Sequence, residues 1–277
     1  MTCTRPWLYK MKDGSIIELP CGRCMACRIR KKSEWSLRLL NELEYWKESC
    51  FMTLTYKDEN LPLDLSLNLS EIQKFIKRLR KAVKKKIKVF YCGEYGEENL
   101  RPHYHLIVFG WRPLLTDLYL LGEKKSRKLY ASRFIEGLWT FGFNNIGVVE
   151  HESIQYVCGY TTKKLYGPMA IAEYGARVRP FMHCSKGLGL RYALDHKDQI
   201  VEDKSVIVKG KKVGIPMYYK IKLGLLGPEF AKLAKEREQL MRNRYHPDMD
   251  DVEFHNLVKS DRMRREHESD WKERNKK

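Results

Sequence analysis

The sequence predicts an α+β fold in which a central antiparallel sheet is flanked by helices. Short stretches that alternate between apolar and polar residues, as strands do, are separated by longer stretches with a helical repeat of apolar residues. They follow one another in the order strand, helix, strand, strand, helix, strand, helix. This order is typical of an α+β domain. The 277 residues are enough to bury a sizeable core.

The first predicted helix covers residues 34–47. Its apolar residues recur at helical spacing, namely Trp35, Leu39, Leu43 and Trp46. The stretch 51–56 (Phe-Met-Thr-Leu-Thr-Tyr) follows, and its alternation and its threonine and aromatic content indicate a strand.

The second predicted helix begins at Ser70 and ends near Lys86. Ser70 and Gln73 have the spacing of a capping box, which is typical of a helix N-terminus. The apolar face of this helix consists of Ile72, Phe75, Ile76 and Leu79. Its many lysines and arginines would face solvent or a nucleic acid.

The remaining pattern predicts further strands at 87–92, 103–111 and 145–149, helices at 129–141 and 153–165, and a hairpin at 206–222 that turns at 209–212. From residue 228 the chain is highly charged, and we expect a helical extension there that is disordered toward its end.

We therefore predict three segments. Residues 1–47 form a basic, cysteine-containing N-terminal segment with its helix, residues 48–167 form the core, and residues 168–277 form a C-terminal extension.

The charge points to a polyanionic partner. Lys and Arg number 53 against 35 Asp and Glu, which gives a formal net charge of +18. Nucleic acid is favoured over an anionic membrane surface, because no basic helix with a bulky apolar face stands out. A generically basic surface is the other alternative. No apolar run is long enough to span a membrane and the N-terminus lacks a signal-peptide core, so we expect a cytoplasmic protein.

Two histidines predict a metal site. His103 and His105 are two residues apart in a strand, so both side chains point to one face and can bind one ion. The third ligand should be a carboxylate on a neighbouring strand. Glu94 fits that position, with Glu97 and Glu98 in the predicted turn as competitors. Two imidazoles and a carboxylate suit Mg²⁺ or Mn²⁺.

Two tyrosines predict nucleophiles. Tyr156 and Tyr160 are four residues apart, so they lie on one face of a helix, and Lys163 and Lys164 follow. A nearby ammonium favours the phenolate. With a basic chain, the electrophile implied is a DNA phosphodiester, and attack would leave a phosphotyrosyl intermediate. Each motif alone is more often structural, and the case rests on their joint occurrence.

Cysteines form a third feature. Cys21, Cys24 and Cys27 have zinc-like spacing, and Cys3 would complete a four-cysteine structural zinc site if the N-terminus folds back. An iron–sulfur cluster or reduced thiols are the alternatives.

Together these motifs resemble the rolling-circle replication initiators of the HUH endonuclease superfamily, in particular those of gokushovirus-type Microviridae phages. The resemblance covers residues 20–167. It implies an HUH endonuclease (RRM-like) topology, a divalent metal on Glu94, His103 and His105, and attack by a tyrosine on origin DNA. The free 3′-OH would prime the host polymerase. The second tyrosine would cut the regenerated origin and allow ligation, in the cytoplasm of the infected bacterial host. A host helicase is a further expected partner.

One position departs from the family pattern. In two-tyrosine relatives a lysine commonly follows each tyrosine by three residues, and Tyr160 has Lys163 while Tyr156 has Gly159. Either Lys163 or Lys164 serves both tyrosines, or Tyr156 is the weaker nucleophile. We expect Tyr160 to make the first cut.

Two other functions compete with this interpretation. A non-catalytic single-stranded DNA-binding protein would explain the charge and the aromatic content, but not the paired histidines with an upstream glutamate. An HUH relaxase usually carries its tyrosine before the histidines, and an HUH transposase usually has one tyrosine in a shorter chain. The order and number of tyrosines therefore favour replication initiation.

Overall fold

The computed structural model describes residues 3–10, 16–96, 99–124, 127–163, 168–208 and 210–225, with isolated residues between 239 and 264. Most of the predicted C-terminal extension lies outside these residues, as do Glu97, Glu98 and Lys164. Two compact units are distinguished: one is Trp35–Tyr192, the other Met1–Glu34 with Ala193–Lys277. The predicted segments 1–47, 48–167 and 168–277 stay a prediction, since compact units need not coincide with functional segments.

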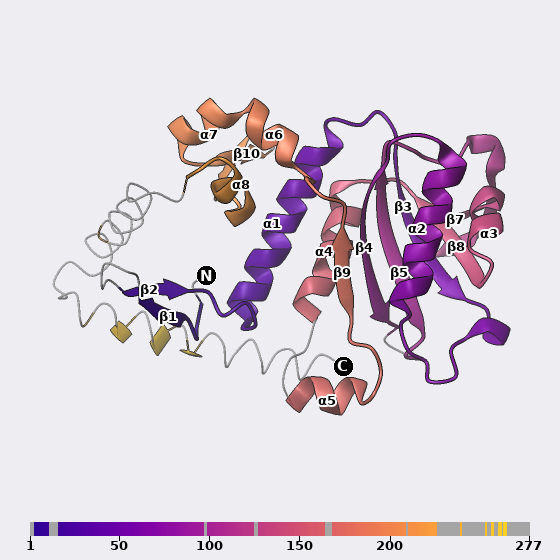
Figure 1. The fold of residues 1–277 in the computed structure, drawn as a ribbon, viewed down its shortest axis with the longest axis horizontal. Coiled ribbons are helices and arrows are strands. Elements are labelled where there is room, and N and C mark those ends of the chain that lie inside the picture. The colour runs from indigo at the N-terminus through magenta and orange to yellow at the C-terminus, as the bar shows by residue number, and fades with distance from the viewer. Residues whose placement is uncertain are drawn as a thin grey trace. The chain divides into compact units, whose positions relative to one another are not determined.

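The unit Trp35–Tyr192 is built on one seven-stranded sheet (Figure 1). The strand order is β6-β7-β8-β3-β5-β4-β9, and all pairs are antiparallel. The predicted α+β fold with a central antiparallel sheet is confirmed. The strands are β3 (Ser49–Tyr56), β4 (Lys88–Tyr95), β5 (Pro102–Phe109), β6 (Leu118–Lys124), β7 (Arg127–Ser132), β8 (Gly142–Gly147) and β9 (Phe181–Cys184).

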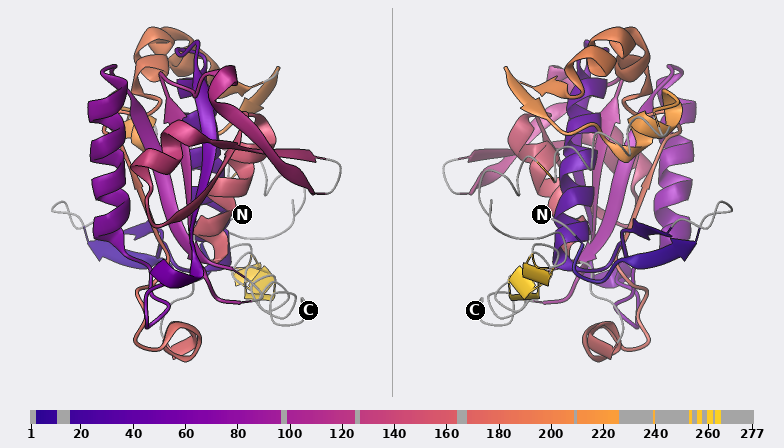
Figure 2. Two further views of the ribbon diagram at one scale, coloured as in Figure 1. Left: turned by 90° about the vertical axis from the view of Figure 1, so that its right-hand side faces the viewer. Right: turned by 90° about the vertical axis from the view of Figure 1, so that its left-hand side faces the viewer.

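Helices cover both faces of this sheet, as the edge-on view on the left of Figure 2 shows for α2 and α4. One face packs against α2 (Leu69–Val83) and α3 (Arg133–Leu138). The other packs against α4 (His151–Lys163) and the second half of α1 (Met25–Leu43). Residues of β5 alternate between these layers: Tyr104, Leu106 and Val108 join the first core, while Ile107 and Phe109 join the second. The odd-numbered positions of β5 therefore face α4.

Several predicted elements have different bounds. The helix predicted at 34–47 begins at Met25 and ends at Leu43. Its first turns carry mostly basic residues and lack the apolar repeat on which the prediction depended. The helix predicted at 129–141 is wrong in its first half, because residues up to Ser132 form β7 and α3 covers only Arg133–Leu138.

The predicted capping box at Ser70 is also wrong. The N-cap is Asn68, whose side chain accepts hydrogen bonds from the backbone amides of Ser70 and Glu71. Asn68 also donates to the carboxylate of Glu71, so the cap lies two residues earlier than predicted. The predicted apolar face of α2 is confirmed, since Ile72, Phe75, Ile76 and Leu79 are all buried.

Three strands of this unit were missed or shifted in the prediction. β6 was not anticipated, and β9 adds an edge strand beside β4 from a region where the sequence pattern is weak. The strand predicted at 145–149 lies at 142–147, as β8. The short helix α5 (Pro168–Tyr174) and the 3₁₀ turns η1 (Asp58–Asn60) and η2 (Leu115–Asp117) complete the unit.

The second unit contains two small hairpins. β1 (Trp7–Lys10) pairs with β2 (Ile16–Leu19), and β10 (Val206–Val208) pairs with β11 (Lys211–Val213). The hairpin predicted at 206–222 is therefore confirmed only in its first part, because Met217–Lys222 forms helix α8. The other helices are α6 (Leu190–Asp195), which begins in the first unit, and α7 (Lys197–Asp203). None of the helices in the described part of the chain is long and apolar enough to cross a membrane.

Candidate active site

The centre of the candidate active site is His105 on strand β5. The predicted strand placement of His103 and His105 on one face is confirmed, since both lie in Pro102–Phe109 two residues apart. Their rings are nearly parallel, at 6°, with centroids 6.5 Å apart. His105 is only 4% exposed. Antiparallel neighbours β3 and β4 flank this strand, so they supply the groups around its side chains.

Both ring nitrogens of His105 have partners on those neighbours. Its Nδ1 lies 2.9 Å from Thr53 Oγ1, from the β3 residue directly opposite in the register. Its Nε2 lies 2.8 Å from Glu94 Oε1, on β4. A ring held at both nitrogens has a fixed orientation, and fixing the ring in this way is what the polar neighbours of metal-binding histidines commonly do.

His103 is held from the other side. Its Nδ1 lies 2.7 Å from the carbonyl oxygen of Arg101. A carbonyl can only accept, so Nδ1 carries the hydrogen and the Nε2 lone pair of the neutral ring is left for a ligand. Burial lowers the pKa of His103, and this favours the neutral ring. A Cβ on Gly96 would lie 3.0 Å from the ring, so glycine there lets the two strands' ends approach closely.

This donor set fits a divalent cation. Neighbouring ligands of an octahedral Mg²⁺ lie about 3 Å apart, given its short metal–oxygen distances. The 2.8 Å separation of Glu94 Oε1 and His105 Nε2 is close to that value. Glu94 is also paired directly with His103 in the register of β4 and β5. One carboxylate and two imidazoles suit such an ion, provided that the Nε2 atoms of the two histidines converge on it.

The two tyrosines lie on α4 against the same histidine. The Tyr160 ring stacks on that of His105, with centroids 5.0 Å apart and an angle of 1°. Tyr156 meets His105 edge-on at 5.4 Å and Tyr160 at 5.1 Å. The predicted common helix face is thereby confirmed. The two differ in access, since Tyr160 is 8% exposed and Tyr156 is 52% exposed.

The electrostatics of Tyr160 favour the neutral phenol in this arrangement. Burial raises its pKa, and the negative charge of Glu94 raises it further. A cation bound at Glu94 would oppose the second effect. Lys163 is the last residue of α4, but neither its side chain nor Lys164 belongs to the described part of the chain. The predicted role of these lysines stays a prediction.

Sequence reasoning missed the role of Thr53. It identified the Thr-Leu-Thr stretch as part of a strand, but not the contact of the Thr53 hydroxyl with His105. Phe51 was missed as well, and its ring is nearly parallel to that of His105 at 5.9 Å. Both residues alternate along β3 on the site's face. The pattern could have suggested this, but only after the pairing of β3 with β5 was known.

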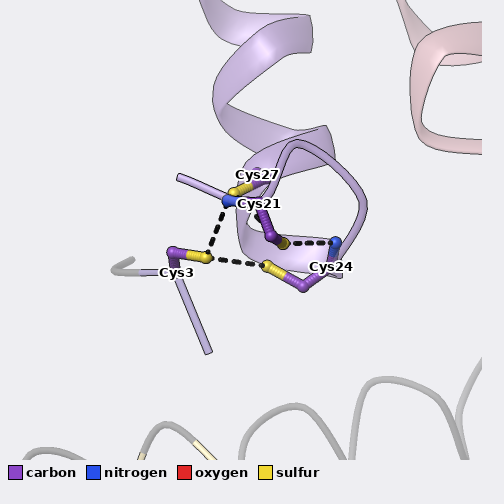
Figure 3. A group of neighbouring side chains, drawn as sticks. All are labelled: Cys3, Cys21, Cys24 and Cys27. Atoms are coloured by element: carbon purple, nitrogen blue, oxygen red, sulfur yellow. Dashed lines mark hydrogen bonds between the residues drawn. The ribbon is translucent and has the colours of Figure 1, made fainter. Parts of the chain in front are cut away.

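The four predicted cysteines form a second cluster, drawn in Figure 3. Cys3, Cys21, Cys24 and Cys27 offer sulfur atoms that all lie within 4.8 Å of one another, a group that could hold a metal ion such as zinc. The N-terminus does fold back, as the completion of a four-cysteine site requires. The cluster lies in the unit Met1–Glu34 with Ala193–Lys277, and the histidines lie in the other unit.

Comparison with known proteins points to one family. A family model for replication-associated proteins of the ORF2 type matches residues 49–165, which include both histidines, both tyrosines and Glu94. The chain is 33% identical over 228 residues to "Replication-associated protein ORF2" of Spiroplasma virus 4, covering 76% of this chain and 70% of that protein. No solved structure gives a significant match.

Two further phage proteins are similar. The chain is 31% identical over 234 residues to "Replication-associated protein ORF4" of Chlamydia phage 1, covering 82% of this chain and 58% of that protein. It is 28% identical over 256 residues to "Replication-associated protein VP4" of Bdellovibrio phage phiMH2K, covering 83% and 79%. The resemblance first drawn from the histidine and tyrosine motifs is thus confirmed, and the chain belongs to the ORF2 family of replication-associated proteins.

Proposed function

We propose that this protein is a phage replication initiator that acts as a metal-dependent, site-specific nickase and ligase of single-stranded DNA. It starts and ends rolling-circle replication through a 5′-phosphotyrosyl intermediate of the HUH type. The names of its relatives support a role in phage replication. The observation that carries the chemistry is the contact of Tyr160 with His105, whose Nε2 is in turn held by Glu94.

This arrangement places a nucleophile next to an ion-binding donor set. A divalent cation held by Glu94, His103 and His105 would polarise the scissile phosphate. Tyr160 Oη attacks the phosphorus, the bond from phosphorus to the 3′ oxygen breaks, and a 5′-phosphotyrosyl ester forms. The phenol loses its proton, and the leaving 3′ oxygen gains one. The ester conserves the energy of the broken bond, so the later ligation needs no cofactor.

Tyr156 supplies the second nucleophile. Its ring contacts both Tyr160 and His105, so either tyrosine can reach a phosphate bound beside the histidines. The greater exposure of Tyr156 suits a residue that receives the regenerated origin after one round of synthesis. The first 3′-OH primes the host polymerase, and the last joins the displaced strand into a circle. A host helicase opens the duplex, and all steps take place in the infected cell.

The basic helix α2 has a separate place. It packs on the sheet face that carries Tyr104, Leu106 and Val108, opposite the face of the histidines. Its lysines and arginines therefore do not line the proposed cleavage site. Any contact that they make with DNA would involve the duplex or strand outside that site.

A denaturing-gel shift tests the proposal. Purified full-length protein is mixed with end-labelled single-stranded origin DNA and Mn²⁺, and covalent complexes are separated under denaturing conditions. We expect a metal-dependent covalent band that is lost in His105→Ala and in the double variant Tyr156→Phe/Tyr160→Phe. The matched control Tyr119→Phe removes a hydroxyl remote from the histidines, on β6, and should leave the band intact.

The same experiment separates the competing functions. Tight DNA binding without a covalent band, on an origin sequence known to be cut in infected cells, would favour a non-catalytic single-stranded DNA-binding protein. Cleavage followed by strand transfer between unrelated sequences would favour a relaxase or transposase. Joining of the displaced strand into a circle, by contrast, is the product that an initiator makes.

A further inference from the structure

Four cysteines from three places in the chain meet outside the nuclease sheet. Cys3 precedes strand β1, Cys21 follows strand β2, and Cys24 and Cys27 lie at the beginning of α1. Their sulfur atoms lie within 4.8 Å of one another (Figure 3). All four side chains are buried or partly buried, and within the described residues their apolar cluster adds only Ala26 to the cysteines themselves.

The sulfur spacing suits one tetrahedral ion. Four sulfurs at zinc–thiolate distance from a common centre lie about 3.8 Å apart. Cys3 Sγ and Cys24 Sγ are 3.9 Å apart, and Cys21 Sγ and Cys27 Sγ are 4.0 Å apart. These distances are about twice the length of a disulfide bond, and all four cysteines are free. An iron–sulfur cluster would have to place several iron and sulfide atoms among its ligands, for which so compact a set leaves no room.

The backbone around the cluster is arranged for thiolates. The amides of Arg23 and Cys24 both point at Cys21 Sγ, at 3.4 Å each. The amide of Cys21 points at Cys3 Sγ at 3.3 Å. The turn that aims two successive amides at one sulfur passes through Gly22, whose φ of +73° is in the left-handed region that glycine adopts readily. Hydrogen bonds to sulfur stabilise the charged form that binds a metal.

Positive charge also surrounds the cluster. Four thiolates and one Zn²⁺ carry a net charge of −2, which requires compensation if the site is partly buried. Arg30 Nη2 lies 3.9 Å from Cys27 Sγ. Cys24 and Cys27 lie at the N-terminal end of α1, where the helix dipole favours negative charge.

We propose that Cys3, Cys21, Cys24 and Cys27 bind one structural Zn²⁺. The ion joins both ends of the β1–β2 hairpin to the N-terminus of α1. An isolated two-stranded hairpin is only marginally stable in water. All four residues of β1 are exposed, so packing contributes little to holding this hairpin in place. The four protein ligands close the coordination sphere, which is typical of zinc sites that stabilise folds rather than catalyse reactions.

Metal analysis of the full-length protein tests this proposal independently of DNA cleavage. The protein is purified without chelators from medium supplemented with zinc, and metals are counted by mass spectrometry. We expect about one zinc per chain. We expect the same content in His105→Ala and in Cys184→Ser, which changes a partly exposed cysteine of the other unit. Cys21→Ser and Cys24→Ser should lose the zinc.

A second measurement avoids reliance on variants that could misfold. The native wild-type protein is alkylated before and after removal of metal with a strong chelator, and the modified cysteines are mapped by peptide mass spectrometry. We expect Cys3 and Cys21 to be protected until the metal is removed, although both are partly exposed. Cys184 has the same intermediate exposure and should react equally in both states.

Three results would overturn the proposal. Absence of zinc from the wild-type protein, with Cys3 and Cys21 alkylated at once, would show that the cluster consists of reduced thiols. Iron in place of zinc would retain a cysteine metal site but exclude the assigned metal. Zinc that is lost in His105→Ala and retained in Cys21→Ser would assign the ion to the histidines.

Discussion

The nuclease sheet and the cysteine cluster gather ligands in opposite ways. In the sheet, Glu94, His105 and Thr53 come from three strands, and the antiparallel register brings them together. In the cluster, three of the four cysteines lie within seven consecutive residues, and only Cys3 comes from a distance. The first set offers nitrogen and oxygen, while the second offers sulfur alone. The two sets therefore favour different ions and different roles.

The contrast extends to access. The proposed catalytic ion has at most three protein ligands and leaves positions for phosphate oxygens, whereas four thiolates fill the coordination of zinc. An open site belongs beside a nucleophile, and two tyrosines are there. A closed site belongs where the fold has little core of its own, and the exposed β1–β2 hairpin is such a place. Substitutions in each region should therefore have distinct consequences.

Loss of the stacked tyrosine hydroxyl should have the greatest consequence. Tyr160→Phe should reduce the first cleavage of origin DNA by about 10³-fold or more, because the nucleophilic oxygen is removed while the ring that stacks on His105 remains. Tyr156→Phe should reduce the first cleavage by roughly tenfold or less, but should prevent completion of circular product. Single-turnover rates on labelled DNA measure both. Equal rates for the two variants would remove the proposed division of roles.

The next effect concerns the closed site. Cys21→Ser should abolish zinc binding and make residues before α1 sensitive to protease, because the hairpin loses its attachment. Limited proteolysis with mass mapping measures this, with Cys184→Ser as the matched control. Retained protease resistance in Cys21→Ser would mean that packing, rather than an ion, holds this segment.

A smaller effect is expected from the residue that orients His105. Thr53→Val keeps the side-chain shape and removes the hydroxyl next to His105 Nδ1. Partners of this kind typically change metal affinity by about 10–100-fold, so the Mn²⁺ concentration needed for half-maximal cleavage should rise by such a factor. Thr55→Val, on the same strand and face, is the control. If both variants behave alike, the hydroxyl of Thr53 does not position the histidine.

The weakest effect concerns a region remote from the candidate active site. Asn68→Ala should lower the free energy of unfolding by about 1 kcal/mol, because the N-cap of α2 loses its side-chain acceptor. Ser70→Ala, at the position of the cap predicted from sequence, should change it much less. Denaturant titration measures both, and cleavage by the two variants should equal that of the wild type. A larger loss in Ser70→Ala would restore the predicted capping box.

These residues also indicate what could be read from the sequence. Local patterns sufficed for the histidine strand, the tyrosine helix and the buried face of α2, since each depends on spacing within a single element. The role of Thr53 could not be predicted, because it depends on which residue of another strand lies opposite His105. Strand β9 was missed for a similar reason, as its four residues join the sheet through pairing with β4 and show no clear alternation.

Identifying the residue that carries DNA would decide whether α4 supplies the nucleophile. The covalent complex formed with origin DNA and Mn²⁺ is digested with nuclease and protease, and the modified peptide is sequenced by mass spectrometry. We expect a nucleotide attached through a 5′ phosphate to Tyr160 after the first cleavage. An adduct on a residue outside α4, or the absence of any adduct while the DNA is still cut, would contradict the proposed mechanism.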